Sequence, residues 1–212
     1  MSKLSEIVKV KDDIKRTIER KEVEVDVGMS LYYEKIDLIP RKVGGRLKGV
    51  RFGGSTFTSA PNMDLSKETN INHLFWSCKN LTHIPRLDTS NITSMFATFE
   101  YCEGLVDASN LIYWDTSRVS NMMNLFEGCS SLSSIPLLDV SSLRKADHLF
   151  YGCSNLVEIK LKGDPSNIWT GSVIFDGVGV GGTLYYDDRY DYKWVISKLP
   201  SSWTAIPFNY SE

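Results

Sequence analysis

Apolar positions recur along the middle of the chain with one period. Four phenylalanines each stand three residues before a cysteine, and each cysteine stands three residues before a leucine: Phe75-Cys78-Leu81, Phe99-Cys102-Leu105, Phe126-Cys129-Leu132 and Phe150-Cys153-Leu156. The cysteines are 24, 27 and 24 residues apart, and the same spacing separates Asp64, Asp88, Asp115 and Asp139. Because a unit this short cannot bury its own apolar side, it must stack on copies of itself. The pattern therefore predicts a solenoid.

Each repeat is predicted to contain a short strand and then a short helix. The strand is the apolar run between leucine and aspartate, with equivalent places taken by Ile84, Leu111, Ile135 and Ile159. Stacked copies of it would form a parallel ladder. After the aspartate, side-chain oxygens can cap a helix, and apolar residues then follow at i, i+3 and i+7, as in Ile92, Met95 and Phe99. A left-handed helix cap is expected at Gly104, Gly128 and Gly152.

The repeats resemble the BspA-like class of leucine-rich repeats, a bacterial-surface type. The resemblance rests on residues 126–139 and 87–96 and covers residues 54 to 163. It implies an extracellular, surface or bacteriophage structural protein that binds other macromolecules and has no catalytic residue in its repeats. The sequence departs from the family pattern at residues 106–109 and at Arg86, and the second full copy has three extra residues around 111–114. Such an insertion is expected to bulge at a loop on one face.

Two flanking segments complete the predicted organisation. Residues 4–39 resemble a short module of bacteriophage head and tail proteins, and a narrow helical stripe there gives the candidate anchoring or oligomer face: Leu4, Ile7, Ile14 and Ile18. The tail is predicted to cap the last repeat, with a strand at 184–186 and a short helix at 192–199. The predicted fold is an α/β solenoid with an N-terminal helical module and linker (1–45), four to five repeats of 24–27 residues (46–163) and a mixed C-terminal cap (164–212).

The composition and charge of the chain limit the kinds of partner that it is expected to bind. With 212 residues and 42% apolar content, the chain is long enough to bury a core, and its net charge of −2 gives no strong field for nucleic acid. Residues 1–50 have 12 basic and 9 acidic residues, a balance of +3, which leaves −5 for the rest. This segment is either a solvated helix or a docking element for an acidic partner. No apolar run approaches the ~20 residues of a membrane span, and the first residues lack the apolar region of a secretory signal.

The chemistry-bearing residues do not form a catalytic, cofactor or metal-binding set. The four cysteines lack the paired spacing of a zinc site, and stacked copies hold equivalent residues too far apart for comfortable disulfides. A buried file of thiols is therefore favoured over zinc or disulfides. His73 and His148 occupy the same repeat position, which indicates a structural role. We predict that the chain is not an enzyme and that it needs no cofactor.

Candidate binding residues lie on the strand side of the repeats, where solenoids usually bind. Arg86, Tyr113 and Trp114 are of the types that dominate interface energies. Alternatively, Tyr113 and Trp114 pack between strands, since one of the two must face inward. The predicted function is that of a bacteriophage virion structural protein, a head-fibre or tail-fibre component assembled in the host cytoplasm. Its N-terminus would join other virion proteins in an oligomeric assembly, and its repeats would bind a host-surface protein or glycan.

Two other function classes stay open. The first is a bacterial cell-surface adhesin whose targeting segment is missing from this chain. The second is an enzyme that uses the C-terminal tail, for which the sequence offers no nucleophile–base pair.

Overall fold

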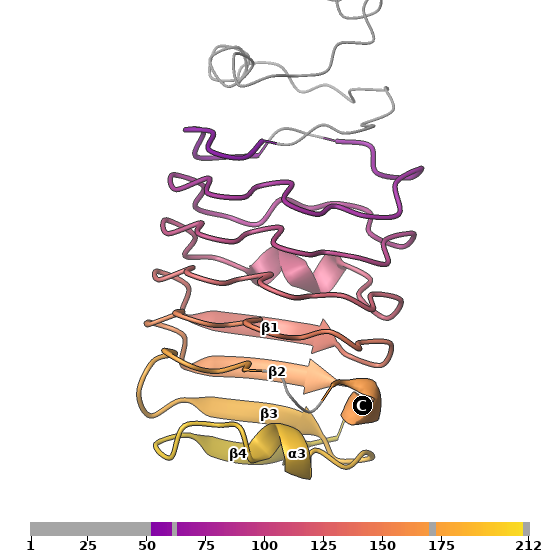
Figure 1. The fold of residues 1–212 in the computed structure, drawn as a ribbon, viewed down its shortest axis with the longest axis vertical. Helices are drawn as coiled ribbons and strands as arrows, with labels where there is room; N and C mark the ends of the chain where they lie inside the picture. The colour runs from indigo at the N-terminus through magenta and orange to yellow at the C-terminus, as the bar shows by residue number, and fades with distance from the viewer. Residues whose placement is uncertain (1–51, 61–62, 170–172, 210–212) are drawn as a thin grey trace, which may run out of the picture.

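The computed structural model describes residues 52–60, 63–169 and 173–209, which wind into a parallel β-solenoid (Figure 1). Four strands form one sheet in chain order: β1 (Ser134–Asp139), β2 (Glu158–Lys162), β3 (Thr183–Asp187) and β4 (Thr204–Phe208). Each neighbouring pair is parallel, so the chain makes three turns of the solenoid between β1 and β4. The predicted solenoid is confirmed. The predicted N-terminal module, with Leu4, Ile7, Ile14 and Ile18, lies outside the described residues.

The coils before β1 follow the same path with looser pairing. On the strand side, His83 forms a single parallel bridge with Asp107. A second series of parallel bridges joins equivalent residues of four successive coils: Asn70, Ser94, Asn121 and Lys145. Both series link positions one repeat apart, which is the stacking that the sequence period predicts.

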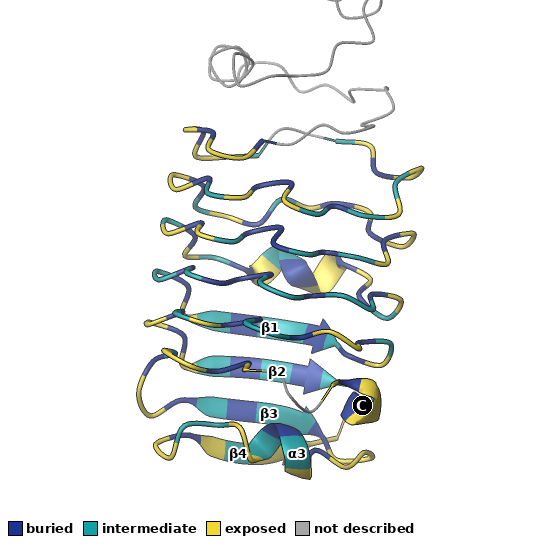
Figure 2. Ribbon diagram, in the orientation of Figure 1, coloured by how far each residue is buried: buried dark blue, intermediate teal, exposed yellow. Residues whose placement is uncertain are grey.

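A column of phenylalanine rings runs through the core. The six rings are stacked with centroids 5.4–6.0 Å apart and interplanar angles of at most 20°: Phe52, Phe75, Phe99, Phe126, Phe150 and Phe175. All six are buried. Buried and partly exposed positions alternate along β2, so one side of the sheet lies against this column (Figure 2). Each ring thus has part of its apolar surface covered by the next coil.

The cysteines form a second file beside the rings. All four are free and fully buried. Each thiol donates to the carbonyl of a phenylalanine in the preceding coil at 2.9–3.1 Å: Cys78 to Phe52, Cys102 to Phe75, Cys129 to Phe99 and Cys153 to Phe126. Burial raises the pKa of the Cys78 and Cys153 thiols to about 12. The predicted buried file of thiols is confirmed.

The helix predicted in each repeat is wrong. Its place is taken by three successive turns, closed in the second copy by Thr98 N–H to Met95 O at 3.3 Å, Glu100 N–H to Ala97 O at 3.4 Å and Cys102 N–H to Phe99 O at 3.1 Å. The alternate N–H groups donate to the next coil at 2.6–3.0 Å: Ala97 to Met123 O, Phe99 to Leu125 O and Tyr101 to Glu127 O. Because these N–H groups donate hydrogen bonds to the next coil, they cannot also form the hydrogen bonds of a helix. We call the side of the solenoid built from these turns the turn side.

The left-handed conformation predicted at Gly128 and Gly152 is confirmed, but it belongs to a turn. Each is the third residue of a Phe–Cys turn and has φ of +70°, as type II turns require. The prediction is wrong at Gly104, which is outside the left-handed region. Tyr101 takes the turn position with φ of +58° in the second copy, so the backbone holds this conformation even without glycine.

The inserted residues bulge as predicted and form the 3-10 helix η2 (Ser109–Tyr113). Ile84 N–H donates to Asp107 O at 3.1 Å, and so Ala108, not Leu111, takes the place opposite Ile84. In the tail, β3 and the short helix α3 (Lys193–Ile196) confirm the predicted strand and helix. A second 3-10 helix, η3 (Pro165–Asn167), follows β2. Since β2 pairs with β3, the repeats and the tail share one sheet.

Candidate functional site

The outward side of the sheet, which we call the strand face, carries a row of mixed side chains. In β2 these are the residues that alternate with buried Ile159 and Leu161. Lys160 is aligned with Tyr185 of β3, and its ammonium lies 5.5 Å from the centre of that ring. It also pairs with Glu158 at 3.1 Å. The strand face therefore presents charges and aromatic rings that neighbouring strands hold in place.

η2 interrupts this face and is fixed at both ends to the preceding coil. Asn110 Nδ2 donates to Ile84 O at 2.8 Å, and Trp114 Nε1 donates to Pro85 O at 3.0 Å. Leu111 is buried beneath it. The helix is consequently a rigid projection, because three different contacts determine its position.

The structure separates the three predicted binding residues. Trp114 is only 6% exposed, and its ring centre lies 5.8 Å from that of Phe99, so it belongs to the core. Tyr113 is 50% exposed, and the guanidinium of Arg86 lies 3.8 Å from the centre of its ring. Arg86 and Tyr113 come from successive coils and form one exposed stacked pair. The sequence could not reveal this pairing because the insertion changes the register between the two coils.

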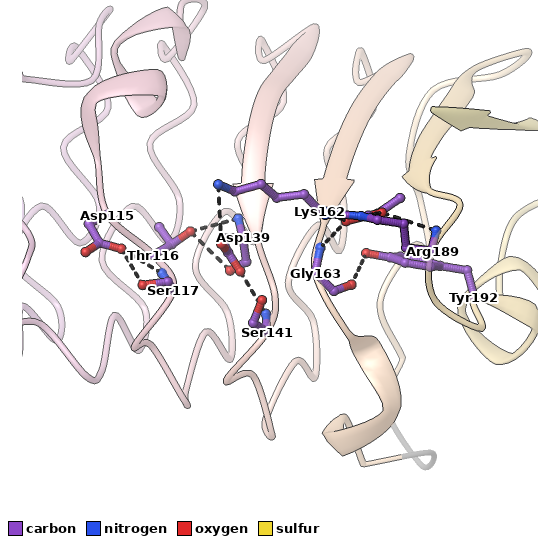
Figure 3. Close-up of polar contacts among 10 residues, drawn as sticks. Asp115, Thr116, Ser117, Asp139, Ser141, Lys162, Gly163, Arg189 and Tyr192 are labelled. Atoms are coloured by element: carbon purple, nitrogen blue, oxygen red, sulfur yellow. Dashed lines mark hydrogen bonds and ion pairs between the residues drawn. The ribbon is translucent and has the colours of Figure 1, made fainter. Parts of the chain in front are cut away.

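Beside Tyr113 lies a hollow of about 390 Å³, which we call the η2 hollow. It is lined by η2, the residues that follow it, and the ends of β1 and β2: Leu111, Ile112, Tyr113, Trp114, Asp115, Thr116, Ser117, Leu137, Asp139 and Lys162. Figure 3 shows the polar members Asp115, Thr116, Ser117, Asp139 and Lys162 in successive coils. Of these residues, the sequence analysis proposed only Tyr113 and Trp114 for binding. The regular spacing of the aspartates, which include Asp115 and Asp139, was the signal that could have pointed to the others.

Local turns fix the carboxylates of the η2 hollow. Asp115 Oδ1 accepts from Ser117 N–H at 3.0 Å and from its hydroxyl at 2.6 Å. Asp139 Oδ1 accepts from Ser141 N–H at 2.9 Å, and Asp139 Oδ2 lies 3.4 Å from Lys162 Nζ. The aspartates expected to cap helices thus form turns with the residue two positions on. Their side chains are held in one orientation at the end of the strands.

The row of polar residues ends at the half-exposed side chain of Arg189 (Figure 3), which forms an ion pair with a buried carboxylate. Asp187 is fully buried and accepts two bonds from the Arg189 guanidinium, at 2.8 and 2.7 Å. It also accepts from two backbone groups, Gly163 N–H at 3.1 Å and Arg189 N–H at 3.3 Å. These bonds, chiefly those from Arg189, lower the pKa of Asp187 to about 2. Each oxygen of Asp187 accepts two bonds from protein groups, and neither residue lines the η2 hollow, so this pair stabilises the last coils.

A second polar cluster lies on the turn side. Glu127 Oε1 accepts from the Tyr101 hydroxyl at 3.0 Å, and Oε2 lies 3.5 Å from His148 Nδ1. The hydrogen bond to Glu127 raises the pKa of Tyr101. His73 and His148 share a turn position with positive φ, which confirms their equivalence but not the predicted helix. Among the residues that the structure describes, no three histidine, cysteine or carboxylate side chains gather as metal ligands would.

The family model for "Mycoplasma protein of unknown function, DUF285" matches residues 51–162, which is 112 of the 212 residues. The chain belongs to the DUF285 family. This family is of the BspA-like leucine-rich-repeat type, so that part of the predicted resemblance is confirmed. The DUF285 match includes η2 and ends at Lys162, and therefore contains every residue of the η2 hollow.

No curated protein and no solved structure matches the chain. The predicted resemblance of the head to a bacteriophage module lies outside both the DUF285 match and the described residues. Within the described ranges, no helix has the length and apolar character to cross a membrane.

Proposed function

We propose that this DUF285 chain is a non-enzymatic binding module that holds a macromolecular partner on its strand face. The observation that carries the proposal is the exposed Arg86–Tyr113 pair. Tyr113 lies in η2, which is anchored to the preceding coil, and the guanidinium of Arg86, from that preceding coil, lies 3.8 Å from the centre of its ring. Arginine and tyrosine are enriched among the residues that dominate binding energy.

Rigidity supports the same proposal. Binding costs free energy whenever side chains or loops must be ordered. Asn110 and Trp114 already anchor η2, and the neighbouring strands already align Lys160 with Tyr185. A partner would therefore meet a surface that needs little further ordering, and several copies on one particle or cell would add avidity.

Two biological settings are proposed for this module. In the first, it is a head-fibre or tail-fibre component of a virion that binds the surface of a host bacterium. In the second, it is an adhesin on a bacterial surface. The description of the DUF285 family names Mycoplasma, a bacterium, and this supports the second setting.

Cell-binding measurements test the proposal and separate the settings. Fluorescently labelled protein, tetramerised on streptavidin, would be applied to bacterial cells and to cultured epithelial cells, and retention measured by flow cytometry. We expect Arg86→Glu to reduce retention at least tenfold. Arg118→Glu is the matched control, because Arg118 is also exposed but donates to Ser90 O, at 3.4 Å, rather than stacking on Tyr113.

Retention on bacteria would favour the virion setting, and retention on epithelial cells the adhesin setting. Equal retention of the two variants, or no retention on either surface, would count against the strand face as a binding surface.

A further inference from the structure

We propose that the η2 hollow binds a neutral sugar ring, which stacks on Tyr113 and bonds its hydroxyl groups to Asp115, Asp139 and Lys162. The proposal rests on the proposed function and deepens it by naming the class of ligand. Four features of the hollow lead to it: an aromatic platform, polar groups of both kinds, balanced charge and suitable size.

Tyr113 supplies the platform. Half of the residue is exposed, and Arg86, from the preceding coil, lies over one face of the ring at 3.8 Å. The other residues that line the hollow belong to η2 and to the following coils, including Leu137 of β1 and Lys162 of β2. Arg86 therefore approaches the ring from the side away from the hollow. The electron-rich face of an aromatic ring attracts the polarised C–H groups on one side of a sugar ring.

The polar groups match hydroxyls, which both donate and accept. Asp115 uses Oδ1 for Ser117, and no bond to its Oδ2 is found within the described residues. Asp139 and Lys162 offer an acceptor and a donor 3.4 Å apart. A vicinal pair of hydroxyls can bond to both, with one donating to the carboxylate and the other accepting from the ammonium. The turns that fix both aspartates prepare these groups in advance.

Charge selects a neutral ligand. Two carboxylates, Asp115 and Asp139, are balanced by two cations, Lys162 and Arg86, within or beside the hollow. An anionic ligand would face both carboxylates, and a cationic ligand would face Lys162 and lie one aromatic ring away from Arg86. A neutral polyhydroxyl compound meets neither repulsion.

Size and polarity agree with a short segment of glycan. The hollow, of about 390 Å³, lies at the small end of the range of about 300–1,000 Å³ for ligand sites. Its apolar lining includes Tyr113, Ile112 and Leu137, and its polar lining includes Asp139 and Lys162 at the ends of β1 and β2. This division fits a ring with one apolar face and a hydroxylated edge.

Titration with simple glycosides tests the proposal on the full chain. The probes are the methyl glycosides of glucose, galactose, mannose and N-acetylglucosamine, with glucuronic acid and glucosamine as charged comparisons. Saturation-transfer NMR detects binding, and chemical-shift titration gives Kd. We expect at least one neutral glycoside to bind with Kd in the millimolar range and to bind at least fivefold tighter than either charged sugar.

Three variants locate the site. Tyr113→Ala should weaken binding at least tenfold, whereas Tyr113→Phe, which keeps the ring, should stay within threefold. Asp115→Asn keeps an acceptor for Ser117 but removes the charge, and should weaken binding at least threefold. Tyr190→Ala is the matched control, because Tyr190 is also exposed beside an arginine, Arg189 at 5.6 Å, but lines no part of the hollow. Unchanged thermal melting confirms that each variant is folded.

Three results would each overturn the proposal. The first is no binding of any neutral glycoside at about 50 mM, a concentration that would nearly saturate a site with a Kd of about 1 mM. The others are equal binding by Tyr113→Ala and the wild type, and tighter binding of a charged sugar than of the neutral glycosides. Cell retention that depends on Arg86 but survives periodate oxidation of surface glycans would show that the strand face binds protein. In that case the glycan proposal fails while the proposed function stands.

Discussion

Removing one ring from the middle of the phenylalanine column should cost much of the stability of the solenoid. Phe126 is fully buried and stacks on Phe99 at 5.7 Å and on Phe150 at 6.0 Å, with interplanar angles of 1° and 5°. A buried Phe→Ala change typically costs about 3–5 kcal/mol through lost burial and the remaining cavity. The loss of two stacked pairs, each about 0.5–1.5 kcal/mol, puts Phe126→Ala near 5 kcal/mol.

Urea denaturation followed by tryptophan fluorescence measures this loss. Because domains of this size are stable by only about 5–15 kcal/mol, Phe126→Ala could leave little folded protein, so Phe126→Leu is measured beside it and should cost about 1–2 kcal/mol. Tyr151→Ala is the control: Tyr151 belongs to the following coil but is 43% exposed, and its loss should cost less than about 1 kcal/mol. If Phe126→Ala were no more destabilising than Tyr151→Ala, the stacked column would not support the fold as argued.

Three further predictions concern turns and ionisable groups. Gly128→Ala should destabilise by about 1 kcal/mol more than Gly152→Ala: both have φ of +70°, but a Cβ on Gly128 would lie 2.5 Å from Tyr101 Cδ1 and displace the Tyr101–Glu127 bond. Thermal melts that rank them equally would refute this. Burial raises the pKa of the Cys129 thiol well above its ordinary value. The unfolded chain therefore loses this proton first, and stability should fall above pH ~8.5 by about 1.4 kcal/mol per pH unit per thiol. The free energy of unfolding of Cys129→Ala should therefore fall with pH by about 1.4 kcal/mol less per pH unit than that of the wild type. Equal slopes for the two proteins between pH 9 and 10 would contradict this. Asp187, with a pKa of about 2, should add about 1–2 kcal/mol of stability above pH ~4, most of it lost as the pH falls toward 2. The difference between wild type and Asp187→Asn should shrink over this window, and a difference independent of pH would refute the assignment.

The repeat could be predicted from sequence because stacking requires the same side chain at the same place in each copy. Phe75, Phe99, Phe126 and Phe150 stand in one column for this reason, and the cysteines stand beside them. The predicted helix was wrong because a series of turns can also bring every third or fourth side chain to one side of the chain. Apolar spacing alone cannot separate these structures. Glycine did not separate them either, because the positive φ of Gly128 and Gly152 suits a helix cap and a turn alike.

The candidate site was less accessible to sequence reasoning. Arg86 and Tyr113 were singled out by residue type, but their contact depends on how η2 folds back over the preceding coil. Trp114 is also of a residue type that is common in binding sites. Its side chain nevertheless fills the core position that Leu87 occupies one repeat earlier. Only the three-residue insertion, which shifts Leu111 away from Ile84, decides which aromatic side chain is exposed.

The most direct test of the account is an NMR measurement of contacts between phenylalanine rings. The chain has nine phenylalanines, so a sample with ¹³C-labelled phenylalanine rings gives few enough signals to assign. The stacked solenoid predicts ring-to-ring NOEs in an unbroken series from Phe52 through Phe75, Phe99, Phe126 and Phe150 to Phe175. Rings without NOEs to their neighbours in this series would contradict the stacking of the repeats, and with it the rigid strand face on which both proposals rest.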